Sequence, residues 1–294
     1  MSEIFGIPIN AFMGQLLIGL INGSFYALLS LGLAVIFGLL NIINFTHGAQ
    51  YMMGAFAAYF LLNKLGMNYW WALVVAPLAV GATGVVIERF MLSKLYKLDH
   101  LYGLLLTFGL ALIIEGVFRN EFGSAGLPYS MPEQLQGGHN LGFMFLPNYR
   151  AWVIGASLAV CIGTWLLIEK TKLGAYLRAA TENPKMVEAF GVNVPRMITL
   201  TYGFGVGLAA LAGVFAAPIY QVSPQMGSSL IIVVFAVVVI GGMGSIMGSI
   251  VTGFGLGLIE GLTKYFYPEA SSTVIFVIMA IVLMVRPQGL FGQR

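Results

Sequence analysis

The polar side chains that lie among the apolar runs of this chain do not have the spacing of a catalytic centre. His47 is one of three histidines and has no second ligand near it, so it predicts neither a metal site nor catalysis. The sequence holds no His-Glu-x-x-His, no Gly-x-Ser-x-Gly elbow, no paired aspartates within an apolar run and no phosphate-binding loop of the Gly-x-x-x-x-Gly-Lys-Ser/Thr type. We therefore expect no metal, no cofactor, no enzymatic activity and no ATP binding by this chain itself.

Two pairs of opposite charges lie four residues apart, a spacing that places the partners on one face of a helix. They are Glu115 with Arg119, and Glu260 with Lys264. Both are expected to be helix-end pairs rather than transport residues. Cys161 is the only cysteine, so no intrachain disulfide can form, and it is expected to be a small buried or lipid-facing residue.

Polar residues also cluster between two apolar runs, where residues 41–51 read Asn-Ile-Ile-Asn-Phe-Thr-His-Gly-Ala-Gln-Tyr. Placing these side chains in hydrocarbon would be costly, so they should face protein or a water-filled path. One interpretation is a tight turn between two membrane spans, with Asn44 or Thr46 capping the next helix. The other is a helix end that lines a translocation path.

The composition defines the elements that carry these residues. Of the 294 residues, 59% are apolar and only 9% are charged, whereas soluble domains carry about 25% charged residues. Spans of about 20 apolar residues cross a bilayer as helices. Such runs lie near 12–38, 45–62, 70–88, 101–118, 151–168, 197–219, 229–246, 248–265 and 272–285. We therefore predict an all-α, polytopic transmembrane helical bundle of about nine spans, within a range of 8–10, as a single domain over 1–294.

Lys and Arg in short loops predict the orientation of the bundle. The loops 89–100 and 169–196 and the C-terminal tail carry most of the basic residues, and nine spans place all of them on one side, which should be the cytoplasm. Loop 119–150 and the N-terminus are then external. The net charge of +3 is too small to suggest a nucleic-acid partner; the expected surroundings are a lipid bilayer.

Glycines recur from 241 to 261, and they allow two interpretations. Small residues four apart let helix backbones approach closely, which suggests a packing role for Gly244, Gly248, Gly253 and Gly257. A broken or re-entrant segment that exposes backbone groups to a cavity is the alternative.

The loop 169–196 contains the signals of a short helix outside the membrane. Asn183 suits the N-cap, Pro184 the first helical position and Gly191 the C-terminal stop, which predicts about seven helical residues. Arg178 and Glu182 lie four apart and could pair with each other or reach a partner. The short helix is expected either to rest on the bilayer or its own bundle, or to dock a cytoplasmic partner.

Taken together, four stretches resemble the permease subunits of branched-chain amino-acid ABC importers, most closely the shorter of the two permeases. They are 41–48, 174–192, 241–248 and the ending Arg-Pro-Gln-Gly-Leu-Phe-Gly at 286–292, and the resemblance covers essentially the whole chain. It implies a multi-pass subunit of the bacterial cytoplasmic (inner) membrane. It also implies three kinds of partner: a second permease that is a different but similar chain, two cytoplasmic ATPase subunits and an extracytoplasmic substrate-binding protein.

The resemblance also implies roles for individual residues. Residues 183–190 look like the coupling helix, and the ATPase-coupling residues would be Arg178, Glu182, Asn183, Pro184, Glu188 and Gly191. The Glu-Ala-Ala-x-x-x-Gly signature of many importer permeases is absent here, because Gly191 lies only three residues after Glu188. Val187 also stands where the family is expected to have alanine. Candidate residues of the translocation path are Asn41, Asn44, Thr46, Gln50 and Ser245.

The expected function is that of the permease subunit of an ATP-driven importer of branched-chain amino acids, working by alternating access. A permease for urea or short amides is the first alternative. A stand-alone secondary transporter or channel is the second, although few acidic residues lie within the spans and that reading leaves the cytoplasmic helix unexplained.

Overall fold

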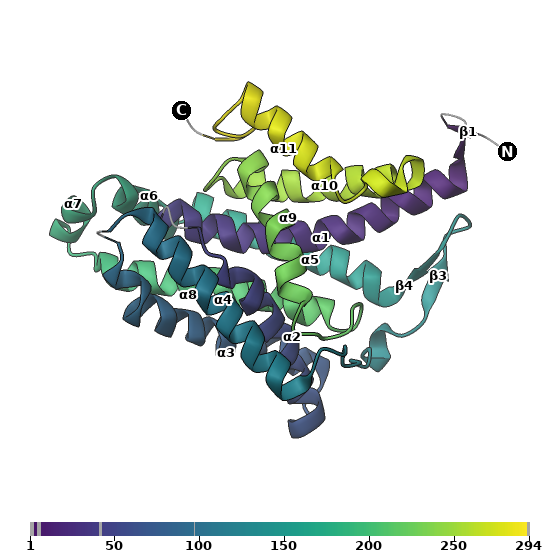
Figure 1. Ribbon diagram of the computed structural model, residues 1–294, viewed down its shortest axis with the longest axis horizontal. Coiled ribbons are helices and arrows are strands. Elements are labelled where there is room, and N and C mark those ends of the chain that lie inside the picture. The colour runs from purple at the N-terminus through teal and green to yellow at the C-terminus, as the bar shows by residue number, and fades with distance from the viewer. Residues whose placement is uncertain (1–2, 5–6, 41–42, 97, 293–294) are drawn as a thin grey trace.

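The computed structural model describes residues 3–4, 7–40, 43–96 and 98–292, and over these residues the chain is a bundle of α-helices with two small strand pairs (Figure 1). The helices are α1 Ile9–Leu40, α2 Thr46–Leu65, α3 Tyr69–Phe90, α4 His100–Phe122, α5 Asn148–Lys170, α6 Lys172–Glu182, α7 Pro184–Ala189, α8 Val194–Ala216, α9 Met226–Gly241, α10 Ile246–Phe266 and α11 Val274–Val285. Short 3-10 turns are η1 Leu92–Lys94, η2 Glu133–Leu135 and η3 Pro268–Ala270.

The predicted fold class is correct, and each predicted span corresponds to a helix. Six helices are long and apolar enough to cross a membrane, namely α1, α3 with its following turn, α4, α5, α8 and α10. The apolar helices α9 and α11 have only 16 and 12 residues, which at about 1.5 Å per residue is less than the roughly 30 Å of a bilayer core. Helix α2 has 20 residues, but its first turn carries polar side chains.

Helix α1 lies at the centre and contacts α5, α8, α9 and α10. Its closest partner, α10, runs antiparallel to it along a row of small residues. A Cβ atom on Gly19 would lie 2.6 Å from the Gly257 carbonyl oxygen, and Gly253 faces Ala27 two turns further along. Of the four glycines expected in packing, Gly253 and Gly257 therefore lie where the two backbones approach closely.

Helix α8 joins the central pair to α2 and α3. A Cβ on Gly54 of α2 would lie 2.5 Å from the Cα of Ala210, and a Cβ on Gly81 of α3 would lie 3.0 Å from the Gly203 carbonyl oxygen. Most of α8 is buried, whereas among the residues of α4 only Gly103 and Thr107 are. Helix α4 therefore stands at the edge of the bundle.

Helices α9 and α10 are separated by a tight break at residues 242–245. Gly242 and Gly244 have φ angles of 102° and 83°, conformations that L side chains rarely adopt. The Gly244 Cα packs against Gly38 near the end of α1, and Gly248 packs against Gly241 across the break. The C-terminal tail covers this corner, because the backbone amides of Leu290 and Phe291 donate to the carbonyls of Ile240 and Gly241.

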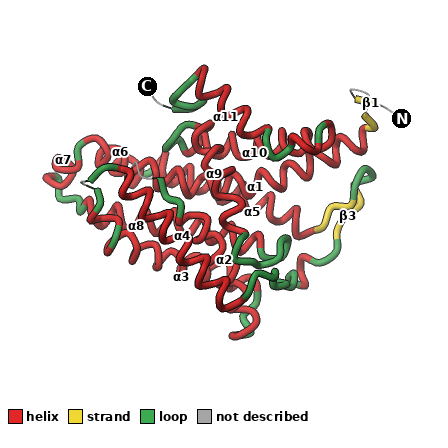
Figure 2. Tube along the Cα trace, in the orientation of Figure 1, coloured by secondary structure: helices red, strands yellow, loops and turns green. Residues whose placement is uncertain are grey.

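The two ends of the molecule differ in structure (Figures 1 and 2). One end carries α6, α7 and the turn after α3. The other carries β1 Glu3–Ile4 with β2 Ile7–Pro8, and β3 Gly138–Asn140 with β4 Phe145–Pro147, each an antiparallel pair. The two most basic loops, 89–100 and 169–196, thus share one end.

Candidate functional site

The polar stretch after α1 lies inside the bundle, because α2 begins beside the middle of α1. The His47 Nε2 atom lies 3.0 Å from the Leu29 carbonyl oxygen, and a Cβ on Gly32 would touch the His47 ring. Helix α1 continues for two more turns beyond Gly32, so the start of α2 is not at the surface. The short connection from α1 therefore leads to a helix start that is buried inside the bundle.

The predicted caps of α2 are also absent. Phe45 occupies the N-cap position without a side-chain bond. Thr46 instead donates to the Thr107 carbonyl at 2.9 Å, while the Thr107 hydroxyl donates to the Ile43 carbonyl at 3.1 Å and accepts from the Phe45 amide at 3.3 Å. These bonds fasten the start of α2 to α4, which satisfies backbone groups that a helix start leaves free.

The polar side chains of this stretch point into the protein. Asn44, Thr46, His47 and Gln50 are each no more than 1% exposed. The Asn44 amide nitrogen donates to the Gln50 side-chain oxygen at 3.5 Å, and both residues are polar neighbours of the buried Tyr202 hydroxyl of α8. Asn41 lies outside the described residues.

The opposite side of the same helix start faces a groove, which we call the α4–α9 groove. Phe45, Gly48 and Ala49, spaced by three and four residues, form its floor. Its volume is about 240 Å³. The walls come from α4, from the start of α9 and from the turn that precedes α9: Phe108, Ala111, Leu112, Glu115, Pro224, Gly227, Ser228, Ile231 and Ile232.

Two contacts shape the floor of the groove. Gly48 meets Gly227, because a Cβ on Gly48 would lie 2.7 Å from the Gly227 carbonyl oxygen. The rings of Phe45 and Phe108 meet edge to face, with centroids 5.9 Å apart. The groove is thus a largely apolar site smaller than the roughly 300–1,000 Å³ typical of drug-sized pockets.

Ser245, the remaining candidate for the translocation path, has a local structural role. Its hydroxyl oxygen accepts from the Gly248 amide at 3.1 Å, so Ser245 caps the start of α10. It lies at the glycine break and not in the α4–α9 groove.

The second candidate region is the loop 169–196, which forms two helices where one was predicted. The predicted helix is α7, and its caps are confirmed: the Asn183 Oδ1 atom accepts from the Met186 amide at 3.1 Å, Pro184 occupies the first turn, and Gly191 adopts a φ of 84°. The additional helix, α6, follows α5 directly. A side chain at Gly174 would collide with the Ile168 carbonyl oxygen, so the tight joint between α5 and α6 needs glycine there.

Helix α7 is fixed on one side and open on the other. Val187 is buried with Ala180 of α6 and Val194 of α8. Met186 and Phe190 are 57% and 78% exposed. Two large apolar side chains therefore project from a capped helix that is anchored to the bundle.

The pairing proposed for Arg178 within its own helix is wrong. The Arg178 Nη1 atom lies 3.1 Å from the Glu169 Oε2 atom of α5 and 3.5 Å from the Ile168 carbonyl oxygen. Arg178 therefore holds α6 against the end of α5. Glu182, at the end of α6, is exposed, as is Glu188, whose backbone carbonyl accepts from the Gly191 amide.

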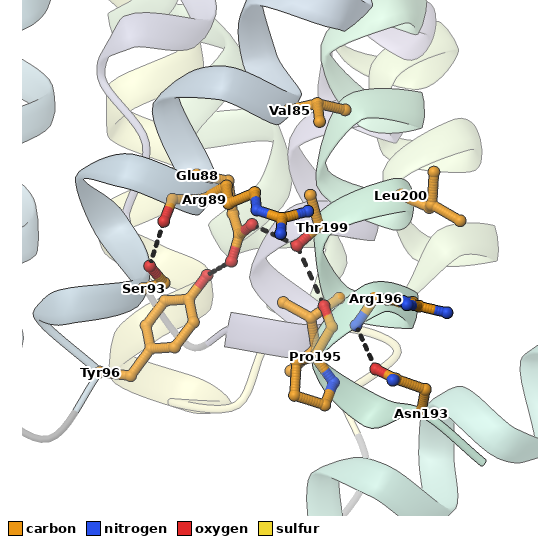
Figure 3. A pocket seen from close by; sticks show the side chains of 11 residues that line it. Val85, Glu88, Arg89, Ser93, Tyr96, Asn193, Pro195, Arg196, Thr199 and Leu200 are labelled. Atoms are coloured by element: carbon orange, nitrogen blue, oxygen red, sulfur yellow. Dashed lines mark hydrogen bonds between the residues drawn. The ribbon is translucent and has the colours of Figure 1, made fainter.

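A cavity of about 710 Å³ lies beside this region, between the end of α3, the turn at 91–96 and the start of α8 (Figure 3). Its wall includes Glu88, which is only 2% exposed. The Glu88 carboxylate accepts from the Tyr96 hydroxyl and, at 2.5 Å, from the Thr199 hydroxyl. Burial, and then the bond to Glu88, raise the pKa of Tyr96 well above its ordinary value, so Tyr96 remains a donor.

Glu88 was not among the sequence candidates. The sequence feature that could have revealed Glu88 is that it is a single acidic residue after an apolar run, Gly-Val-Val-Ile at 84–87. An acidic residue at such a position in a membrane helix indicates a buried partner. The cap of α8 was missed as well: the Asn193 side chain accepts from the Arg196 amide at 3.0 Å. As at α7, a proline lies in the first turn, here Pro195, two residues after the capping asparagine.

One of the two predicted charge pairs forms. The Arg119 Nη2 atom lies 2.5 Å from the Glu115 Oε1 atom. Glu260 instead accepts from the Tyr26 hydroxyl at 2.6 Å, and no ion pair with Lys264 occurs in the part of the chain that the structure describes.

Comparison with known proteins places these features in a family. The family model described as "Branched-chain amino acid transport system / permease component" matches residues 15–283. This chain belongs to that family. Members of this family are transport subunits and not enzymes. The family and the six long apolar helices together make this chain a multi-pass membrane protein.

Named relatives agree with the family match. The permease is 30% identical to the high-affinity branched-chain amino acid transport system permease protein LivH of Escherichia coli K12, over 96% of each chain. It is 29% identical to BraD of Pseudomonas aeruginosa, also over 96% of each chain. It is 26% identical to LivM of Escherichia coli K12, over 90% of this chain and 67% of LivM. No solved structure gave a significant match.

Proposed function

We propose that this permease is one of two membrane subunits of an ATP-driven importer for branched-chain amino acids. The observation that carries the proposal is α7, a capped helix anchored through Val187 with Met186 and Phe190 exposed at its tip. Family membership and the relatives named for branched-chain amino acid transport support the substrate class.

In this proposal α7 docks on one of two cytoplasmic ATPase subunits. Exposed Met and Phe side chains beside a rigid helix match the apolar anchors of protein interfaces. Asn183, Pro184 and Gly191 shape the helix, Glu182 and Glu188 are exposed for partner contacts, and Arg178 transmits movement to α5 through Glu169. If α7 moves with the ATPase, it can shift the balance between the outward-open and inward-open conformations of the permease only if its contacts differ between these two conformations.

A second permease would complete the path. The similarity to both LivH and LivM is what two related but different permeases of one system would give. The sparsely buried α4, with Leu105, Ile113 and Val117 more than half exposed, offers apolar surface to lipid or to that second subunit. An extracytoplasmic binding protein would deliver substrate at the end that carries β1 and β3.

The membrane is proposed to be the bacterial cytoplasmic (inner) membrane. Placing the basic loops 89–100 and 169–196 in the cytoplasm satisfies the positive-inside tendency. The end with α6 and α7 would then face the ATPases.

For the path itself, the start of α2 is the proposed substrate-facing element. Phe45, Gly48 and Ala49 present it to the groove. Asn44, Thr46 and Gln50, together with Asn41 and Ser245, stay proposals as path residues; in the present state the first three support the helix start from within.

The test is leucine uptake by cells that depend on this permease, before and after residues 183–191 are replaced by a Gly/Ser linker. We expect uptake to be lost while the permease remains in the membrane. The matched control replaces residues 141–144, in the hairpin between β3 and β4 at the opposite end, and should retain uptake.

Intact leucine uptake with the linker in place would contradict the proposed coupling role of α7. Uptake that survives ATP depletion but stops with an ionophore would indicate a stand-alone transporter. Uptake of urea or short amides without leucine would indicate the other substrate class.

A further inference from the structure

An ion pair joins the α4–α9 groove to the surface beside it, because Glu115 belongs to the groove lining and its partner Arg119 does not. Glu115 lines the groove, and its side chain is 16% exposed, while Arg119, one turn further along α4, is 51% exposed. The Glu115 Oε1 atom contacts the Arg119 Nη2 atom. The second carboxylate oxygen and most of the five guanidinium N–H donors therefore stay available to a ligand.

The position of Glu115 on α4 is informative. Glu115 lies seven positions before Phe122, the last residue of α4, and the neighbouring Leu112 and Ile113 are 55% and 63% exposed. A carboxylate facing hydrocarbon is costly, so ionisable side chains in spans face protein or water. The groove side of α4 should accordingly face a hydrated path or a protein partner, while Ile113 lies outside the groove lining.

The rest of the groove is small, about 240 Å³, and largely apolar, with Ser228 as the one other polar side chain in its lining. Its large apolar lining residues are Phe45, Phe108, Leu112, Ile231 and Ile232. The site therefore combines a largely apolar pocket with one carboxylate in its lining and one guanidinium that contacts this carboxylate from outside the lining.

We propose that the α4–α9 groove binds a zwitterionic α-amino acid with an apolar side chain, with Glu115 receiving its ammonium group and Arg119 its carboxylate. The assignment rests on the proposed importer function and gives its path a specific site. The aliphatic side chain enters the groove between Phe45 and Ile231. Urea and short amides carry no net charge on either end, so they gain nothing from this ion pair.

A purely structural helix-end pair is the competing explanation, and a charge swap separates the two. Glu115→Arg combined with Arg119→Glu keeps an i, i+4 pair. It places the positive group in the groove, where the ammonium of the substrate would be repelled.

The experiment uses the complete importer, purified with its partner subunits and reconstituted in proteoliposomes with ATP at the ATPase side. The initial rate of radiolabelled leucine uptake is measured for wild type, Glu115→Gln, Arg119→Gln and the charge swap. The matched control is Glu121→Gln, which removes an exposed carboxylate of the same helix that does not line the groove.

We expect at least a tenfold loss of uptake in both single variants and in the swap, with unchanged thermal unfolding of the swap and a wild-type rate for Glu121→Gln. Uptake restored by the swap, or unaffected by Glu115→Gln, overturns the assignment while leaving the importer function standing. If the wild-type importer shows no uptake, or uptake that does not need ATP, both the groove assignment and the proposed importer function are overturned. Failure of the groove assignment alone is thus distinguishable from failure of the importer function.

Cysteine labelling supplies a readout that does not depend on transport. Cys161 is fully buried, so a charged thiol reagent should report only an introduced cysteine. Ser228→Cys, in the groove, should be labelled in membranes and protected by leucine with its binding protein, whereas Ile113→Cys should not be labelled. Equal resistance of both positions means that the groove faces lipid, which overturns the proposal.

Discussion

The substitution Phe190→Ala distinguishes a role of Phe190 in docking α7 on the ATPase from a role in the folding of the permease. The Phe190 side chain follows the last turn of α7 and is 78% exposed, whereas the helix is held to the bundle through Val187, which is 7% exposed. Truncating Phe190 therefore removes little from the packing of this chain. We expect no change in the thermal unfolding midpoint of the purified permease.

The expected loss is in binding to the ATPase. Burying a Phe side chain fully stabilises by about 1.5–3 kcal/mol. Since most of the Phe190 surface is still exposed, docking can recover roughly 2 kcal/mol of that. At about 1.4 kcal/mol per tenfold change, the Kd for the ATPase should rise about 30-fold.

The assay is a titration of the purified ATPase onto the permease in nanodiscs, alongside the ATPase rate of the assembled importer. Tyr267→Ala is the matched control. It removes an aromatic side chain that is 74% exposed at the end of α10, far from α7 in Figure 1. Tyr267→Ala should leave the Kd unchanged.

A Phe190→Ala permease that binds the ATPase with wild-type Kd would refute the reasoning that the exposed tip of α7 is a docking anchor. A lowered unfolding midpoint in the same variant would show that Phe190 packs within this chain, against the exposure on which the prediction depends.

Three further predictions concern stability and local shape. Asn183→Ala removes the cap of α7, costs about 1 kcal/mol of helix stability and should weaken ATPase binding severalfold in the same titration. Gly54→Ala places a methyl group against the α8 backbone and should destabilise by about 1–3 kcal/mol, while Gly155→Ala, with open space around it, should unfold in detergent at the wild-type temperature. Tyr96→Phe deprives the buried Glu88 carboxylate of a donor and should cost about 1.5–3 kcal/mol; an unchanged melting temperature would argue against that bond.

Local signals made α7 predictable. The caps of α7 depend on Asn183, Pro184 and Gly191 alone, so the sequence was sufficient to define the helix. Helix α6 depends instead on a tertiary contact, the approach of Gly174 to the Ile168 carbonyl. The pairing of Arg178 with Glu169 depends on the same fold of α6 back onto α5, and no spacing rule reveals it.

The sequence indicated that the start of α2 is unusual, but it did not predict which side of this helix faces the groove. Helical periodicity separates Asn44, His47 and Gln50 from Phe45, Gly48 and Ala49. It does not say which side faces the groove, because that depends on where α1, α4 and α9 lie. The apolar side was the one exposed to the groove.

The glycine row shows a similar limit. Spacing alone suggested close packing at Gly253 and Gly257. Their partners Gly19 and Gly23 lie more than 200 residues earlier, and only the antiparallel placement of α1 and α10 brings them together. The predicted spans 229–246 and 272–285 were also placed inexactly: the first runs past the end of α9 into the glycine break, and the second begins two residues before α11.

The most direct test of the account is to tag this permease at its native locus, extract it in mild detergent and identify the proteins that co-purify. The account predicts two further kinds of subunit, a similar permease and a cytoplasmic ATPase, with the ATPase lost when residues 183–191 are replaced. Recovery of the permease alone, under conditions in which a known importer stays assembled, would contradict it.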